Sequence, residues 1–446
     1  MRVFSSLKKI ERGRVLVCGD FMLDFYTSGH VKRISPEAPV PVLKVQKKDS
    51  LPGGAGNVVL NLLSLGMDVF VAGRIGNDSA GMMLKKAFET ENADTRALLV
   101  QDGYITPLKN RLIADSQHLL RIDTEEVEPT TDEFEEILLH TIAELLPEID
   151  VIAISDYAKG GITSSFCSNL IELARGFSLP VLVDPKGVDF SKYAGATLIK
   201  PNKNEAYAAA GQEENTPIDT VAEILLEETR VDHIMITRSE EGISTWSKNG
   251  MQITCPAKSK EVVDVTGAGD TVLAAITACF INDIPMMDAL QIANCAASIA
   301  IEHLGCYRVT LPEISKRLLH HDSGNKIFSE VQVSALITVL QKQPYTIIVI
   351  EDVDRLTLEF FSEIQSYCSI RSDYTIVVFI KADVVRGDIV SLLSSFREVN
   401  FIIEQPECMS KVLESVRPTA VLLWEQYGLK DCTPSHKLLN DLIETA

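Results

Sequence analysis

Roughly the first three hundred residues alternate short apolar runs with amphipathic segments. Apolar runs rich in β-branched residues and closed by a small or polar residue are typical of buried strands. Such runs lie at 15–18, 69–72, 151–154, 181–183 and 233–237. Apolar residues at helical spacing predict helices at 133–146, 165–175 and 220–229. The alternation predicts an α/β fold, with a parallel sheet covered by helices on both faces.

Segment 31–45 departs from this alternation, because it carries three prolines among alternating valines and has little helical character. Proline is confined to edge strands and turns in β-structure. The pattern therefore predicts a small β-lid, over about residues 27–48, that projects from the main sheet. A plain surface loop is the alternative.

A second domain is indicated after residue 312. Segment 311–326 starts as a short helix and ends in a polar Asp-Ser-Gly-Asn cluster, which is typical of a linker. The alternation then restarts, with strands expected at 346–350, 374–380, 400–403 and 420–424 and helices at 356–367, 388–396 and 409–416. We predict domains at 1–312 and 329–446, joined by a linker over 313–328. Two or three domains also fit a chain of 446 residues.

Composition narrows the choice of partners. The net charge of -20 disfavours nucleic acid and anionic membranes as main partners, although a locally basic site for an anionic small molecule stays compatible. Residues 1–14 lack the pattern of a signal peptide, and the longest apolar runs, such as 271–281, are too short to span a bilayer. The nine cysteines are scattered, without a C-x-x-C pair. We expect a cytoplasmic protein with reduced thiols.

The run 264–270, Asp-Val-Thr-Gly-Ala-Gly-Asp, precedes a helical segment of small residues. Gly267, Ala268 and Gly269 are therefore expected at a helix N-terminus, where free N–H groups and the helix dipole attract phosphate. Asp270 would then lie where a substrate hydroxyl meets a terminal phosphate, and it could accept the proton of that hydroxyl. The alternative is an ordinary helix start with an acidic first turn.

Other polar residues follow predicted strands, where ligands of such sheets bind. A glycine-rich helix start at 52–57 suits close approach by a polyhydroxylated ligand. Asn202 and Glu205 would share one helical face, where they could hold water on Mg²⁺ or simply form a capping pair. Further candidates after strands are Asp24, Thr237, Arg238, Ser239 and Gly242.

Three motifs occur in order, namely Gly-Gly-x-Gly-Asn at 53–57, Asn-x-x-Glu at 202–205 and Asp-x-Thr-Gly-Ala-Gly-Asp at 264–270. Together they resemble the ribokinase-like, phosphofructokinase-B type, family of sugar kinases. Segments 33–42, 155–160 and 184–187 resemble the heptose 7-phosphate kinase domain of the bifunctional ADP-heptose synthesis enzyme. The similarity covers about residues 10–312. It implies a three-layer α/β/α sandwich with a small β-lid.

The resemblance implies ATP-dependent phosphorylation of D-glycero-D-manno-heptose 7-phosphate at the anomeric hydroxyl, on the route to ADP-heptose and the lipopolysaccharide core. Asp270 would be the base, with residues 267–269 as the anion hole. The implied nucleotide site is Asn202, Glu205, Thr237, Arg238, Ser239, Gly242 and Asn294. The implied sugar site is Asp24, Gly53, Gly54 and Asn57. Glu205 would bind Mg²⁺ through water, and Asp264 lies where relatives bind a monovalent cation such as K⁺. We also expect a homodimer.

A sugar 7-phosphate requires positive charge at the far end of the sugar site. The candidates are Arg33, Arg121, Lys159 and Lys186. Arginine offers phosphate a bidentate fork and lysine a point charge. Each of them alone could equally be a surface or structural cation, but we expect at least two to contact substrate.

In the bifunctional relatives the second domain is a nucleotidyltransferase with a His-x-Gly-His run after its first strand. Here Thr357 and Phe360 stand in place of the histidines and Glu359 in place of the glycine. Carboxylates within 351–354 add negative charge where a triphosphate would approach. We interpret this Rossmann-like α/β domain as a degenerate transferase with a role in packing, dimerisation or regulation. Adenylyl transfer by altered residues, or an unrelated α/β module, are the alternatives.

Three other functions stay open at this point. The chain could phosphorylate a different sugar phosphate or a nucleoside. It could be bifunctional and retain heptose 1-phosphate adenylyltransferase activity. It could also be a catalytically silent sensor of nucleotide or sugar phosphate, although the intact run at 264–270 speaks against that alternative.

Overall fold

The computed structural model describes residues 2–115, 117–257, 262–321, 327–328, 336–337, 340–341, 344–350, 358–371, 374–380, 387–396, 398–403, 405–425 and 428–432. The chain divides into two compact units. One runs from Lys8 to Leu311, and the other contains the later residues together with α1 (Arg2–Leu7). The first unit thus ends next to the predicted boundary at 312, whereas α1 groups with the second unit.

A nine-stranded sheet forms the centre of the first unit, in the order β13-β12-β11-β10-β9-β8-β1-β4-β5. Its strands are β1 (Arg14–Gly19), β4 (Asp68–Gly76), β5 (Asp94–Gln101), β8 (Val151–Ser155), β9 (Val181–Asp184), β10 (Leu198–Ile199), β11 (His233–Thr237), β12 (Ile243–Ser247) and β13 (Gln252–Cys255). All neighbours from β11 to β5 are parallel, and β12 and β13 add an antiparallel edge. Central strands such as β1 and β8 are buried on both faces, which explains their continuous apolar sequences.

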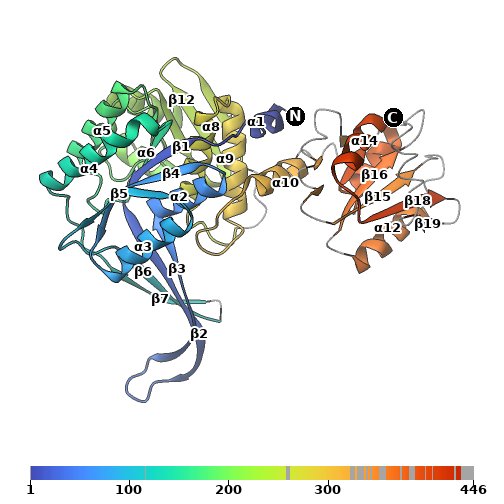
Figure 1. Ribbon diagram of the computed structural model, residues 1–446, viewed down its shortest axis with the longest axis horizontal. Coiled ribbons are helices and arrows are strands. Elements are labelled where there is room, and N and C mark those ends of the chain that lie inside the picture. Colours follow the sequence, from blue (N-terminus) through green and yellow to red (C-terminus); the bar gives the residue numbers. More distant parts are fainter. Residues whose placement is uncertain are drawn as a thin grey trace. The chain divides into compact units, whose positions relative to one another are not determined.

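Helices cover both faces of this sheet (Figure 1). Those that share one apolar core with the sheet are α4 (Asp132–Leu145), α5 (Ser164–Gly176), α6 (Lys203–Ala209) and α7 (Ile218–Thr229). Those that pack together on the other face are α2 (Ala55–Ser64), α8 (Ala268–Ile281) and α9 (Met286–Ala300). Further elements are α3 (Ser79–Thr90) and the short 3-10 helices η1 (Leu146–Glu148), η2 (Ser191–Tyr193) and η3 (Ser239–Glu241). The predicted α/β fold is confirmed.

The lid is a separate four-stranded sheet, in the order β3-β2-β6-β7, that projects from the main body (Figure 1). Its strands are β2 (Phe21–Ile34), β3 (Pro41–Gly54), β6 (Leu108–Ala114) and β7 (Gln117–Thr124). The range predicted for the lid, 27–48, lies within β2, β3 and their connection. Strands β6 and β7 lie outside the segments expected to be strands from the apolar pattern. Every side chain of β7 is exposed, so this strand carries no alternation of buried and exposed positions.

The second unit is a smaller α/β domain with a six-stranded sheet in the order β14-β17-β16-β15-β18-β19. Its strands are β14 (Ile327–Phe328), β15 (Tyr345–Ile350), β16 (Thr375–Ile380), β17 (Phe401–Ile403), β18 (Ala420–Glu425) and β19 (Gly428–Asp431). The helices that follow residue 310 include α10 (Leu311–His321), α12 (Leu358–Ile370), α13 (Gly387–Ser395) and α14 (Pro406–Ser415). Only β19 pairs antiparallel among these strands.

Phe360 lies in the core of this second unit. Its side chain is fully buried and packs edge-on against Trp424, with ring centroids 5.0 Å apart. The neighbouring Glu359 is exposed. Thr357 and the acidic residues within 351–354 lie outside the described residues. Among the residues that are described, no helix is long and apolar enough to cross a membrane.

Candidate active site

The N-terminus of α8 forms the centre of the candidate site. Gly267 precedes the helix with a φ of +76°, in the left-handed region that favours glycine. A Cβ atom at this position would also collide with the side-chain amide of Asn57. Position 267 therefore requires glycine both for its backbone conformation and for the close approach of Asn57.

Asp270 occupies the first turn of α8 and is almost fully buried. The Asn57 amide donates to its Oδ2 (2.9 Å), and the Tyr157 hydroxyl donates to its Oδ1 (2.7 Å). Burial raises the pKa of Asp270 to about 7, and the negative charge of Asp184 adds to this rise. The hydrogen bonds from Asn57 and Tyr157, and the charge of Lys200, oppose it. A carboxylate with this pKa is suited to accept a proton near neutral pH.

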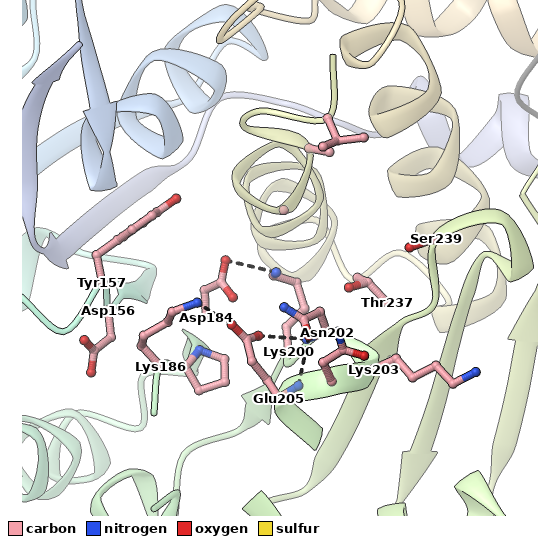
Figure 2. Close-up of a pocket in the computed structure, with 15 residues that line it drawn as sticks. Asp156, Tyr157, Asp184, Lys186, Lys200, Asn202, Lys203, Glu205, Thr237 and Ser239 are labelled. Carbon is pink, nitrogen blue, oxygen red and sulfur yellow. Dashed lines mark hydrogen bonds and ion pairs between the residues drawn. The ribbon is translucent and has the colours of Figure 1, made fainter. Parts of the chain in front are cut away.

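Ala268 and Gly269 of α8 line a cavity of about 430 Å³. Figure 2 shows this cavity with Asp184, Lys200 and Glu205 on its wall. The cavity lies beyond the carboxyl ends of the strands, as expected for such a sheet. Lys200 and Asp184 form an almost buried ion pair on its wall, with Nζ 2.9 Å from Oδ2. A second pair, between Lys186 Nζ and Glu205 Oε1 (2.7 Å), lines the same cavity. The cavity thus combines three lysines, Lys186, Lys200 and Lys203, with the N-terminus of α8, which suits phosphate groups.

Asn202 and Glu205 form a reciprocal capping box at the start of α6. Asn202 Oδ1 accepts from the Glu205 backbone N–H (2.9 Å), and Glu205 Oε2 accepts from the Asn202 N–H (3.0 Å). Both residues also line the cavity, so the capping role and a role near phosphate are compatible. Within the described residues, no cluster of three or more His, Cys, Asp or Glu side chains could hold a metal ion.

A second cavity, of about 470 Å³, adjoins the first and shares Thr237, Ser239, Ala268 and Gly269 with it. Its other walls are mainly apolar and include Ile243, Ala257, Val262, Val272, Ala297 and Ile301. Gly242 and Asn294 also line it. The structure therefore brings most of the expected nucleotide-site residues around two connected cavities. Arg238 instead contacts Glu241, with Nη2 3.5 Å from Oε2.

The expected sugar-site residues gather between α2 and the base of the lid. Asp24 of β2 is almost fully buried, and a Cβ atom at Gly53 would collide with its Oδ2. Gly54 has a φ of +57°. Asp24 Oδ2 accepts from the Cys306 thiol (3.9 Å), whose Sγ lies 3.4 Å from the Cβ position of residue 267. Because Asn57 and Cys306 both lie against Gly267, Asp24 and Asn57 belong to one contiguous group of residues.

The four cations expected at a distal phosphate lie in different places. Arg121 pairs with Asp123 (2.9 Å), and Lys159 pairs with Glu125 (2.6 Å). Lys186 lines the first cavity beside Glu205. Arg33 is exposed near the outer end of β2.

Asp264 precedes α8 and is fixed by three hydrogen bonds. Its Oδ1 accepts from the Thr266 N–H (2.9 Å) and hydroxyl (2.6 Å), and its Oδ2 accepts from the Gly305 N–H (2.9 Å). Burial acts to raise the pKa of Asp264, but these hydrogen bonds outweigh it and lower that pKa. Asp264 is therefore an ionised carboxylate at neutral pH.

Sequence reasoning missed several residues that shape the site. Tyr157 contacts Asp270, and Arg111 of β6 forms an almost buried ion pair with Asp24. Buried Asp20 accepts from the backbone N–H groups of Tyr157 (2.9 Å), Lys159 (2.9 Å) and Gly161 (3.0 Å), so it fixes the loop that carries Tyr157. Asp20 could have been found, because it directly follows the first strand. Arg111 lies in no motif.

Comparisons with known proteins find similarity to carbohydrate kinases. The family model described as pfkB family carbohydrate kinase matches residues 13–314. Bifunctional protein HldE of Trichlorobacter lovleyi is 42% identical over 339 residues, which cover 75% of this chain and 69% of that protein. Bifunctional protein HldE of a Campylobacter jejuni serotype O:2 strain is 41% identical over 329 residues, covering 73% and 69%.

Solved structures share the fold of the first unit. Ribokinase of Arabidopsis thaliana complexed with ribose and ATP superposes with a TM-score of 0.54 at 16% identity, and covers 69% of this chain and 99% of its own. Phosphofructokinase-2 of Escherichia coli in complex with potassium gives a TM-score of 0.57 at 19% identity, with 70% and 99% covered.

Proposed function

Because the chain belongs to the pfkB family of carbohydrate kinases, we propose that it phosphorylates D-glycero-D-manno-heptose 7-phosphate at the anomeric hydroxyl with ATP. The product would be heptose 1,7-bisphosphate, a precursor of ADP-heptose for lipopolysaccharide core synthesis. The chain is a sugar kinase. The choice of a heptose phosphate is supported by 42% identity to a bifunctional protein HldE and by the sequence segments that resemble the heptose 7-phosphate kinase domain.

The observation that carries the mechanism is the position of Asp270. Its carboxylate would accept the proton of the anomeric hydroxyl as the oxygen attacks the γ-phosphate in line. The backbone N–H groups at 267–269 would stabilise the negative charge that develops on the transferred group. Burial keeps the carboxyl group basic enough for this role, since its pKa is about 7.

The nucleotide would occupy the two connected cavities. Its base would enter the apolar cavity beside Gly242 and Asn294, and its phosphates would enter the polar cavity beside Lys186 and Lys200. Asn202 and Glu205 line the polar cavity and would hold Mg²⁺ through water, and the ion would neutralise phosphate charge. Asp264 is ionised and suited to a monovalent cation, in line with the proposal of a K⁺ requirement.

The second unit is proposed to be a degenerate nucleotidyltransferase. Phe360, at the position of an expected histidine, is a core residue here and contacts Trp424. Retained adenylyl transfer is the second candidate, favoured by the bifunctional relatives. We further expect a homodimer that acts in the cytoplasm, where ATP is available.

Mass spectrometry of the reaction products tests these proposals. Purified protein, ATP, Mg²⁺ and heptose 7-phosphate should give heptose bisphosphate and ADP. A panel of other sugar phosphates and nucleosides should react more slowly, and a better substrate in that panel would replace the heptose assignment. Formation of ADP-heptose from heptose 1-phosphate would show that the second unit is active. If ATP were not consumed with any acceptor, a sensor function would replace catalysis.

A further inference from the structure

Lys109 lies on strand β6 of the lid, between two acidic neighbours. In the backbone register of the sheet, Lys109 lies opposite Asp24 of β2 on one side and opposite Asp123 of β7 on the other. Paired residues of neighbouring strands project from the same face of a sheet. Lys109 therefore shares a face with Asp24, and Arg111 and Arg121, two residues along their strands, share that face as well.

The charges around Lys109 do not cancel. Each nearby carboxylate already has a cationic partner, since Asp24 pairs with Arg111, Asp123 with Arg121 and Glu125 with Lys159. The described residues offer Lys109 no ion pair and no hydrogen bond of its own side chain. This group thus contains four cations and three carboxylates, and Lys109 is the cation without an ion-pair partner among the described residues.

The ammonium group of Lys109 is also partly removed from water. The side chain is half-buried, and burial lowers the pKa of Lys109. The charges of Lys159 and Arg121 act in the same direction, whereas those of Asp24 and Glu125 oppose it. A desolvated charge without a counter-ion is unfavourable, so such a group is expected to have an anionic partner in the working protein.

The position of Lys109 relative to Asp270, the proposed base, indicates which anion Lys109 binds. Asn57 donates a hydrogen bond to Asp270 and lies against Gly267. Cys306 also lies near Gly267, and its thiol donates to Asp24. A sugar with its reacting hydroxyl at Asp270 and its ring hydroxyls at Asp24 would present its far end to Lys109. We infer that Lys109, supported by Lys159 and Arg121, binds the phosphate at the end of the sugar opposite the reacting hydroxyl. This inference rests on the proposed function.

The inference gives the lid a role in substrate selection. Lys186, which the sequence suggested for the same phosphate, lies instead in the cavity with Asn202 and Glu205. Arg33 is exposed near the outer end of β2. Lys109 adjoins the sugar-site carboxylate Asp24, and it extends from the strand that also supplies Arg111. An unphosphorylated sugar would leave the positive charge of Lys109 without an anionic partner. The site should therefore discriminate against such sugars.

The test compares Lys109→Met, Lys109→Arg and a matched control, Lys48→Met. Lys48 is an exposed lysine of the same lid on β3, and its pairing with Thr27 places it on the opposite face from Asp24. Each variant is assayed with heptose 7-phosphate and with unphosphorylated heptose. Lys109→Met should raise KM for the phosphorylated sugar roughly 10- to 100-fold, as expected for loss of a charged hydrogen-bond partner, with kcat little changed. Lys109→Arg should recover most of this loss, and Lys48→Met should match wild type.

Activity toward the unphosphorylated heptose separates a binding role from a structural one. Its kcat/KM should be the same in Lys109→Met and wild type, because no phosphate contact is lost. An equal loss on both sugars, or an unchanged KM for heptose 7-phosphate, would overturn the inference while wild-type turnover upholds the proposed function.

Titration calorimetry with heptose 7-phosphate, in the absence of ATP, keeps the two proposals apart. If wild type binds the sugar phosphate without transferring phosphate to it, and Lys109→Met weakens binding, the subsite stands and the proposed function fails. If wild type binds neither heptose 7-phosphate nor inorganic phosphate, the inference itself is wrong.

Discussion

At the scale of single residues, Asp270 combines three properties that suit a working carboxylate. It is buried, both of its oxygens accept hydrogen bonds, and it sits in the first turn of a helix. Burial of a carboxylate is costly unless the group has a function or strong partners. The two neutral donors, Asn57 and Tyr157, hold the group in place without neutralising it.

Asp270→Asn should retain the shape of the site and lose the proton acceptor. Turnover should fall by about 10²- to 10⁴-fold, the usual contribution of general-base catalysis. Binding of ATP, measured by calorimetry, should stay close to wild type. Asp132→Asn is a matched control, because Asp132 is an exposed first-turn aspartate of α4. A near-normal rate in Asp270→Asn would remove Asp270 from the mechanism.

Tyr157→Phe should change the pH dependence of the reaction. The Tyr157 hydroxyl stabilises the ionised form of Asp270, so its removal raises the pKa of Asp270 above about 7. Because the ionised form is the active base, the acidic limb of the kcat/KM profile should move to higher pH. Tyr207→Phe removes a hydroxyl that donates to the Thr216 carbonyl (2.7 Å), and its limb should not move. An unshifted limb in Tyr157→Phe would show that this bond does not tune the base.

At the scale of elements, the junction of β2, β3 and α2 brings a carboxylate against a glycine backbone. Gly53→Ala would place a methyl group against Asp24 Oδ2 and displace that side chain or the strand end. We expect KM for the sugar to rise about tenfold or more, as for other lost charged hydrogen bonds, with KM for ATP nearly unchanged. Gly176→Ala serves as the control, because its added Cβ would meet nothing within 4 Å. Equal effects on both substrates would argue against a sugar site here.

The elements also show what sequence could and could not predict. The buried strands and the amphipathic helices were predictable because apolar periodicity reports burial, as in β1 and α5. The start of α8 was predictable because its glycines and Asp270 form a motif. The lid hairpin of β6 and β7 was not predictable, since β7 is exposed along its whole length. Arg111 and Lys109 of β6 were not predictable for a different reason, because only strand pairing brings them beside Asp24.

At the scale of the whole molecule, every residue of the candidate site belongs to the unit from Lys8 to Leu311. The second unit has its own sheet and its own apolar core, with Phe360 and Trp424 in it. A unit with a separate core can lose stability without any change at a site built from other residues. Catalysis should therefore be insensitive to damage in the second unit.

Phe360→Ala tests this independence. Removing a fully buried aromatic side chain should destabilise the second unit by about 3–5 kcal/mol. Two-step thermal unfolding followed by calorimetry should show one transition moved to lower temperature and the other unchanged, while kcat for the sugar stays within twofold of wild type. Ile370→Ala, on the same helix but with its side chain 81% exposed, should change neither transition. Loss of kinase activity in Phe360→Ala, below the first transition, would mean that the second unit controls the kinase site, which favours a regulatory role over a passive one.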